Sequence, residues 1–247
     1  MTNKKEQKKK KISFPHMGTI SYAWAAALRI IGCEPYVEPY TSKKSLSLGT
    51  KHAPEAICLP YKLILGNFIE AIEGGTDYVA MITSPGCCRL GEYGKCIENA
   101  LHDLGYETKY LELQLYDGIK GMYNFLKEAS GKNNPFLFGR AILIAILKVF
   151  MLDKLETQLS YYRAREIHHG DAEKHYLKSL KYIDAHDTIS GLKKAKKQVD
   201  EEMKKVEINP NKEVLYVDIT GEIYVVNDEF SNQSIEKELG RMGVQVR

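Results

Sequence analysis

The feature that most constrains the fold is an alternation of short apolar strands and helices over residues 12–117. Strand patterns occur at KISFP, CEPYVEPY, DYVAMIT and YETKYLEL, and helical patterns lie between them, the segment 43–75 being broken by Gly49, Pro54 and Pro60. A helix between two strands implies a parallel pair with a right-handed crossover. The sequence therefore predicts an α/β fold with an open, mostly parallel, Rossmann-like sheet.

Strand patterns disappear between residues 118 and 205, where the sequence predicts a connector made of helices. EVLYVDI, SIEKELGRMG and VQVR then follow as a strand, a helix and the beginning of a strand. Three such elements do not bury a sheet by themselves. Either they complete the first sheet, or residues 206–247 are the truncated start of a second α/β domain. We favour the second interpretation.

The basic character of the chain lies at its start. Residues 1–11, MTNKKEQKKKK, contain six Lys and one Glu; without them, 35 Lys and Arg fall to 29, and 32 Asp and Glu fall to 31. We interpret this segment as a disordered, solubilising tail, with weak binding to anions as the alternative. The body of the chain lacks the basic and aromatic pattern of a specific nucleic-acid partner.

The longest apolar run, AILIAILKVFML at residues 141–152, is interrupted by Lys148. It is shorter than the roughly 20 residues of a membrane span, so we expect a buried helix and no membrane partner. No secretory signal follows the basic tail. We therefore expect a cytoplasmic protein whose thiols stay reduced, which favours metal or redox chemistry over disulfides.

Three of the five cysteines lie in ITSPGCCRLGEYGKC, residues 82–96. Cys87 and Cys88 follow a predicted parallel strand, at the edge of the sheet where ligands bind, and Cys58 lies in a loop that we expect to reach the same edge. Thiolates there would select zinc, copper(I) or an iron–sulfur cluster. The absence of C-x-x-C pairs argues against a structural zinc site and against a dithiol. We expect Cys33 and Cys96 to pack as small apolar side chains.

The neighbours of these cysteines suit an anionic centre. Gly86 and Gly91 would let the backbone approach a ligand, and Arg89 and Lys62 would offset negative charge, unless they are simply solvated. His16, in the turn after the first strand, is a further candidate ligand or proton donor that we expect to be solvated.

IHHGDAEKH, residues 167–175, has the composition of a metal site. On a helix, however, His168 and His175 would share a face while His169 would point elsewhere, and we expect Gly170 to break that helix. There is no phosphate-binding loop, dinucleotide fingerprint or nucleophile elbow.

Three motifs in order, E-x-x-C-L-P-x-K at 55–62, C-R-x-G-x-Y at 88–93 and G-E-I-Y at 221–224, carry a family resemblance. With them the chain resembles the acyl-CoA dehydratase activase-related proteins, within the 2-hydroxyacyl-CoA dehydratase and double-cubane cluster superfamily. The resemblance implies an iron–sulfur cluster, 4Fe-4S or double cubane, with Cys58 and Cys88 as ligands. Cys87 stands where relatives commonly have proline, and we take it as an additional ligand or a neutral variant.

The resemblance also implies anaerobic single-electron transfer, or a reductase component, acting with an ATP-dependent activator protein or a companion dehydratase-like subunit. Relatives continue beyond the point where this chain stops. The alternative is a non-catalytic scaffold or partner-binding subunit that keeps the fold without a complete cluster. A zinc site formed by Cys87 or Cys88 with histidines is a third possibility. The sequence leaves the oligomeric state and the substrate open.

Overall fold

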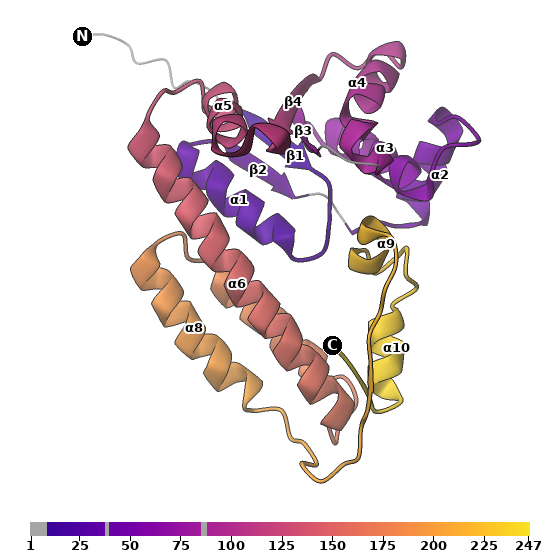
Figure 1. The fold of residues 1–247 in the computed structure, drawn as a ribbon, viewed down its shortest axis with the longest axis vertical. Coiled ribbons are helices and arrows are strands. Elements are labelled where there is room, and N and C mark those ends of the chain that lie inside the picture. The colour runs from indigo at the N-terminus through magenta and orange to yellow at the C-terminus, as the bar shows by residue number, and fades with distance from the viewer. Residues whose placement is uncertain (1–8, 38–39, 85–87) are drawn as a thin grey trace. The chain divides into compact units, whose positions relative to one another are not determined.

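A computed structural model of the chain describes residues 9–37, 40–84 and 88–247. The chain forms two compact units, one made of the residues up to 16 with 27–141, and the other of 17–26 with 142–247 (Figure 1). The unit boundaries fall inside two helices, α1 (Ile20–Ile31) and α6 (Pro135–Arg165). Each unit is described by itself below.

The first unit contains a four-stranded, entirely parallel sheet, which confirms the predicted α/β class. The strand order is β2-β1-β3-β4, with β1 Lys11–Phe14, β2 Glu34–Val37, β3 Tyr78–Thr83 and β4 Lys109–Gln114. The register pairs Phe14 with Val37 and Thr83 with Gln114, so the carboxyl ends of neighbouring strands meet at one edge. The apolar side chains of β1 and β3 are buried, as parallel strands covered by helices require.

The helices of the first unit are α2 (Lys43–His52), α3 (Leu59–Glu73), α4 (Tyr93–Asp103) and α5 (Gly118–Ser130), with the short 3₁₀ helices η1 (Arg89–Glu92) and η2 (Leu115–Asp117). Gly49 does not break its helix, contrary to the sequence-based expectation, because it lies inside α2 where α3 approaches closely. Pro60 does not break a helix either. It occupies the first turn of α3, where the missing N–H would have no partner inside the helix.

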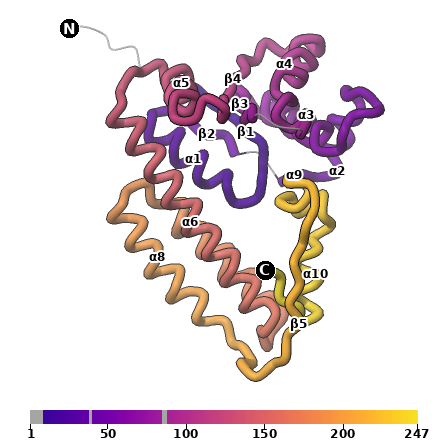
Figure 2. Tube along the Cα trace, viewed as in Figure 1, coloured from indigo at the N-terminus to yellow at the C-terminus, as the bar shows by residue number. Residues whose placement is uncertain are grey.

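The second unit is built mainly from α6 with α7 (Asp171–Asp184) and α8 (Ile189–Met203), as predicted for this helical stretch. The three helices share a core in which Leu155, Ile183 and Met203 are fully buried. Figure 2 shows α8 running alongside α6. The α7–α8 contact also contains an ionic network. Glu202, itself 3% exposed, lies 2.8 Å from His175 and accepts from Lys178 and Lys205.

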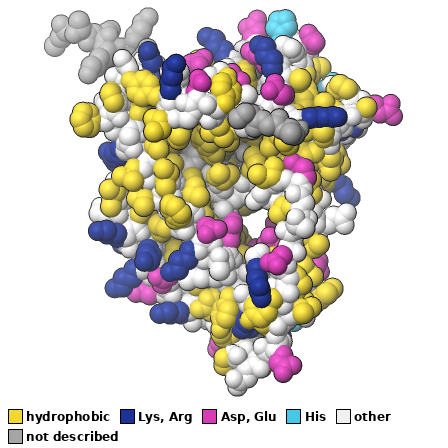
Figure 3. Space-filling model, viewed as in Figure 1, with side chains coloured by type: hydrophobic (Ala, Val, Ile, Leu, Met, Phe, Trp, Pro, Cys, Tyr) yellow, Lys and Arg dark blue, Asp and Glu magenta, His cyan; other side chains and the backbone are white. Residues whose placement is uncertain are grey.

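Helix α6 is only partly the buried helix expected from its apolar run. Leu152 and Ile144 are buried, but Leu143, Ile146 and Phe150 are exposed, and Figure 3 shows hydrophobic side chains gathered over this helix. By length and composition alone, α6 is the single helix among the described residues that could cross a membrane. The cytoplasmic location stays a prediction.

Lys148, which interrupts the apolar run of α6, is fully buried. Its Nζ donates to Asp187 Oδ1 at 2.8 Å and to the Asp184 carbonyl at 3.2 Å, both at the far end of α7. A buried ammonium group is tolerable because it has these charged and polar acceptors.

The carboxyl-terminal elements form a sheet of their own. β5 (Leu215–Val217) pairs in parallel with β6 (Val244–Val246), with α9 (Ile223–Asn227) and α10 (Ile235–Arg241) between them. Among the described residues these strands do not extend the first sheet. The sequence-based domain limits at residues 117 and 205 remain a prediction.

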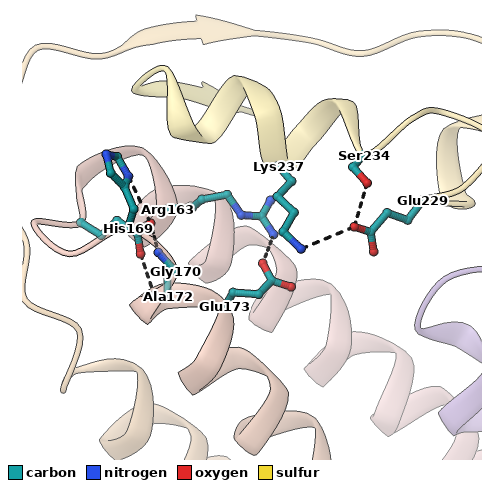
Figure 4. Close-up of polar contacts among 9 residues, drawn as sticks. Arg163, His169, Gly170, Ala172, Glu173, Glu229, Ser234 and Lys237 are labelled. Atoms are coloured by element: carbon teal, nitrogen blue, oxygen red, sulfur yellow. Dashed lines mark hydrogen bonds and ion pairs between the residues drawn. The ribbon is translucent and has the colours of Figure 1, made fainter.

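Polar contacts of α6 side chains and of the residue that follows α6 hold the start of α7, and Arg163 of α6 also packs against α10 (Figure 4). Arg163 Nη2 donates to Glu173 at 2.7 Å. The aliphatic part of the Arg163 side chain packs against Gly240 of α10, in the space that a Cβ on this glycine would occupy. The buried Glu166 accepts from the N–H groups of Gly170 and Ala172, both at 2.8 Å, and so satisfies the first turn of α7.

Candidate functional site

Cys58 lies directly before α3, at the N-cap position, with extended backbone angles. Its side chain makes no capping hydrogen bond, and the cysteine is partly exposed. The amino end of a 15-residue helix carries a partial positive charge from its unpaired N–H groups. A thiolate is therefore favoured at this position over a thiolate in a neutral environment.

Cys88 occupies the equivalent position before η1 and is exposed. The next residue, Arg89, places its Nη1 4.0 Å from the Sγ of Cys58. Among the described residues, the start of η1 and the loop that precedes α3 therefore meet. The sequence-based expectation that the loops of Cys58 and Cys88 reach the same edge is consistent with this contact.

Tyr93, the last residue of the C-R-x-G-x-Y motif, contributes to the electrostatics of this place. A hydrogen bond with Tyr93 has the largest effect and lowers the pKa of the Cys58 thiol; burial opposes it, and the positive charge of Arg89, a smaller effect than burial, lowers the pKa further. Tyr93 is buried at the start of α4, so its position is set by packing. The motif contained this tyrosine, but sequence reasoning gave it no role.

Tyr61, on the first turn of α3, is almost fully buried and packs edge-on against Tyr93, with 5.3 Å between the ring centroids. Burial raises the pKa of Tyr61, and so does the negative charge of Cys96. Cys96 is exposed on α4. The expectation that Cys96 packs as an apolar side chain is wrong, because it lies on the solvent side of the helix, whereas Ile97 and Leu101 face the core.

The predicted supporting residues have local structural roles. A Cβ at Gly91 would overlap the carbonyl oxygen of Ser84, so its missing side chain permits close packing of η1 against the end of β3. Lys62 donates to the Glu55 carbonyl at 3.0 Å and closes the loop before Cys58. Contact of either residue with a ligand stays a prediction. Gly86 and Cys87 lie outside the described residues.

Cys33 is buried, as expected, and its thiol donates to the Ala129 carbonyl at 3.4 Å. Burial raises its pKa, which keeps this thiol protonated and inert. Cys33 and Cys58 are both free cysteines, but the pKa of the Cys33 thiol is raised whereas that of the Cys58 thiol is lowered.

The histidines do not form a shared site. His175 faces Glu202, whereas His168 lies 3.7 Å from Glu207 and His169 lies 3.8 Å from Glu166. The expectation that His16 is solvated is wrong. It is buried and its ring lies 4.6 Å from that of Tyr40, at the end of the first strand.

The donor chemistry around Cys58 fits a cluster only in part. A thiolate-forming cysteine, an arginine beside it and an exposed cysteine that precedes this arginine in the sequence are suitable for a negatively charged iron–sulfur centre. Within the described ranges, however, no group of three or more His, Cys, Asp or Glu residues could hold a metal ion. These residues therefore supply part of a ligand set.

The fold and the site define a class of protein in which an α/β unit, with one partly exposed and one exposed cysteine at its sheet edge, is joined to a helical unit. The chain belongs to the family described as CoA enzyme activase uncharacterised domain, whose match covers residues 16–247. This agrees with the resemblance to acyl-CoA dehydratase activase-related proteins. No curated protein sequence matches the chain.

Proposed function

We propose that this chain is an iron–sulfur component of a 2-hydroxyacyl-CoA dehydratase-like system, in which it takes part in single-electron transfer. The observation that carries the proposal is the approach of Arg89 to within 4.0 Å of the Cys58 thiol, next to Cys88 in sequence. Membership of the CoA enzyme activase family supports the same class of system. The partner would be an ATP-dependent activator protein or a companion dehydratase-like subunit.

Cys58 and Cys88 would provide thiolates to a 4Fe-4S or double-cubane cluster, with Cys87 as a candidate third ligand. When bound, such a cluster supplies reversible one-electron transfer. Arg89 would stabilise the negative charge of the bound thiolates, and Tyr93 would hold Cys58 by its hydroxyl group. The remaining ligands would come from exogenous molecules or from the partner subunit.

The test is anaerobic reconstitution with iron and sulfide, followed by iron and acid-labile sulfide analysis and an absorption spectrum. We expect bound iron with visible charge-transfer absorption, and its loss in Cys58→Ser and Cys88→Ser. Cys33→Ala is the matched control, because Cys33 is buried elsewhere in the same unit. The proposal fails if the unmodified chain, reconstituted with its partner subunit, binds no iron. It also fails if both serine variants bind iron unchanged.

A second candidate is a scaffold or partner-binding subunit that does not hold a complete cluster. It is favoured by the lack of a three-donor group among the residues that the structure describes. The same experiment separates the two, since a scaffold would bind its partner subunit without iron. Zinc, the third possibility, would appear in metal analysis without visible colour.

A further inference from the structure

A cleft of about 510 Å³ lies at the amino edge of the first sheet, opposite the edge that carries Cys58 and Cys88. It is lined by the residues that lead into three strands: Lys9 and Lys10 before β1, Thr76 and Tyr78 at the start of β3, and Glu107 and Lys109 at the start of β4. Its volume is in the range of small-molecule sites. No phosphate-binding motif in the sequence marks it.

Three ammonium groups line this cleft. Lys9 and Lys109 are exposed, and the ammonium group of neither forms an ion pair or a hydrogen bond with any residue that the structure describes. Lys10 is held in place, because its Nζ donates to the Glu128 carbonyl at 2.9 Å and lies 5.1 Å from the centre of the Tyr78 ring. The cleft therefore contains one fixed positive charge and two that are available for a ligand.

Two carboxylates oppose these charges. Asp77 accepts the backbone N–H of Lys11 at 3.2 Å, so it is engaged in joining β3 to β1. Glu107 is exposed on the rim. The hydrogen bond from a neutral N–H leaves the charge of Asp77 in place, so three ammonium groups face two carboxylates and the lining has an excess of one positive charge.

Thr76 gives independent support for a ligand in this cleft. It is 7% exposed and lines the cleft, and its Oγ1 has no hydrogen-bond partner among the described atoms. A buried hydroxyl group normally has a partner, and leaving it without one destabilises the folded state. A rotation about χ1 would exchange its methyl and hydroxyl groups and offer a donor to a ligand in the cleft.

We propose that this cleft binds a phosphate-bearing small molecule, whose phosphate oxygens accept from Lys9, Lys10 and Lys109 and from the Thr76 hydroxyl. Several lysines around one cleft suit a ligand with more than one negative charge, and lysine is a common phosphate-binding residue. The site is separate from the thiols and does not depend on the proposed function.

The experiment is calorimetric titration of the full chain with inorganic pyrophosphate and with ADP at fixed ionic strength. We expect both to bind. Lys109→Gln should weaken binding about threefold, as for loss of an exposed charge pair, and Glu107→Gln should strengthen it by a similar factor. Tighter binding of ADP would assign the ligand to the nucleotides, and equal binding would assign it to inorganic phosphates.

Thr76→Val tests the buried hydroxyl. We expect weaker binding together with unchanged or higher thermal stability, because an unpaired hydroxyl is replaced by a methyl group of similar shape. If Thr76 had a purely structural role, Thr76→Val would not weaken binding while leaving thermal stability unchanged or higher.

Lys51→Gln on α2 and Lys5→Gln in the basic tail are the matched controls for charge, and we expect both to bind as the unmodified chain does. The proposal is overturned if neither probe binds at millimolar concentration. Equal weakening by Lys5→Gln and Lys109→Gln would also overturn it, since the binding would then come from diffuse positive charge.

Discussion

Gly49 on α2 and Gly66 on α3 lie so close that neither has room for a side chain. A Cβ on either glycine would be 3.1 Å from the backbone nitrogen of the other, and would overlap the carbonyl oxygen of Lys62 or of Ser45. Ser45 also donates to Glu70 at 2.6 Å, which joins the two helices by a polar contact. This crossing fixes α3, and therefore the helix end where Cys58 lies.

Gly49→Ala should lower the free energy of unfolding by about 3 kcal/mol or more, because overpacking against a backbone carbonyl cannot be relieved by a side-chain rotation. Chemical denaturation with the far-ultraviolet signal measures it. Gly139→Ala is the control. Its Cβ would meet nothing within 4 Å, so the helical propensity of alanine should stabilise α6 by about 0.5–1 kcal/mol. Equal stability of the two variants would contradict the close crossing.

Tyr93→Phe should raise the pKa of the Cys58 thiol in the reduced, metal-free chain, because the hydrogen bond that lowers it is lost. We expect the midpoint of the pH profile for Cys58 alkylation to move to higher pH, because the thiolate loses one of the hydrogen bonds that favour it. Mass spectrometry of peptides after timed iodoacetamide treatment gives the rates. Arg140→Gln, an exposed arginine on α6, should leave the profile unchanged. An unchanged profile in Tyr93→Phe would show that Tyr93 does not lower the pKa of the Cys58 thiol.

Glu202→Gln should destabilise the chain by about 2 kcal/mol at pH 7, because the buried carboxylate accepts from His175, Lys178 and Lys205. Hydrogen bonds, first that with Lys205, lower the pKa of Glu202 to about 2. A carboxyl group with a lowered folded-state pKa stabilises fully above its unfolded value of about 4.3, and this contribution is lost as the pH falls toward 2.

The difference in stability between Glu202→Gln and the unmodified chain should therefore shrink from pH 5 downward, as thermal unfolding at several pH values would measure. Glu201→Gln is the matched control, since Glu201 is 63% exposed and 3.8 Å from Lys197. We expect it to change stability by less than about 0.5 kcal/mol. A pH-independent effect of Glu202→Gln would rule out the ionic explanation.

Lys148→Met should destabilise the second unit, because Asp187, which is only 24% exposed, loses its ion pair with the Lys148 ammonium group. Removing one member of a buried ion pair costs about 3 kcal/mol, whereas replacing both members costs less. Lys148→Met combined with Asp187→Leu should therefore recover part of the loss. Urea titrations of the single and double variants measure the coupling, and strictly additive effects would show that the pair is not coupled.

The parallel sheet was accessible from the sequence because strand and helix periods alternate from residue 12 to 117. Cys88 and Arg89 were accessible as candidates because the strand before them ends at the edge where ligands bind, and Cys58 because its loop was expected to reach the same edge. Tyr93 was missed, since its role depends on α4 packing against α3. The exposure of Cys96 was also missed, because the helical period places it one residue from the buried Ile97 without indicating which face looks outward.

The sequence by itself determined the α/β class, the long helical stretch and the family, because these depend on local periodicity and on ordered motifs. Only the tertiary structure decided that Arg89 contacts the Cys58 thiol, that Gly49 serves a helix crossing, and that Lys148 is buried with Asp187. Each of these joins residues that are far apart in the chain, and their distances depend on how whole helices and loops pack rather than on local sequence.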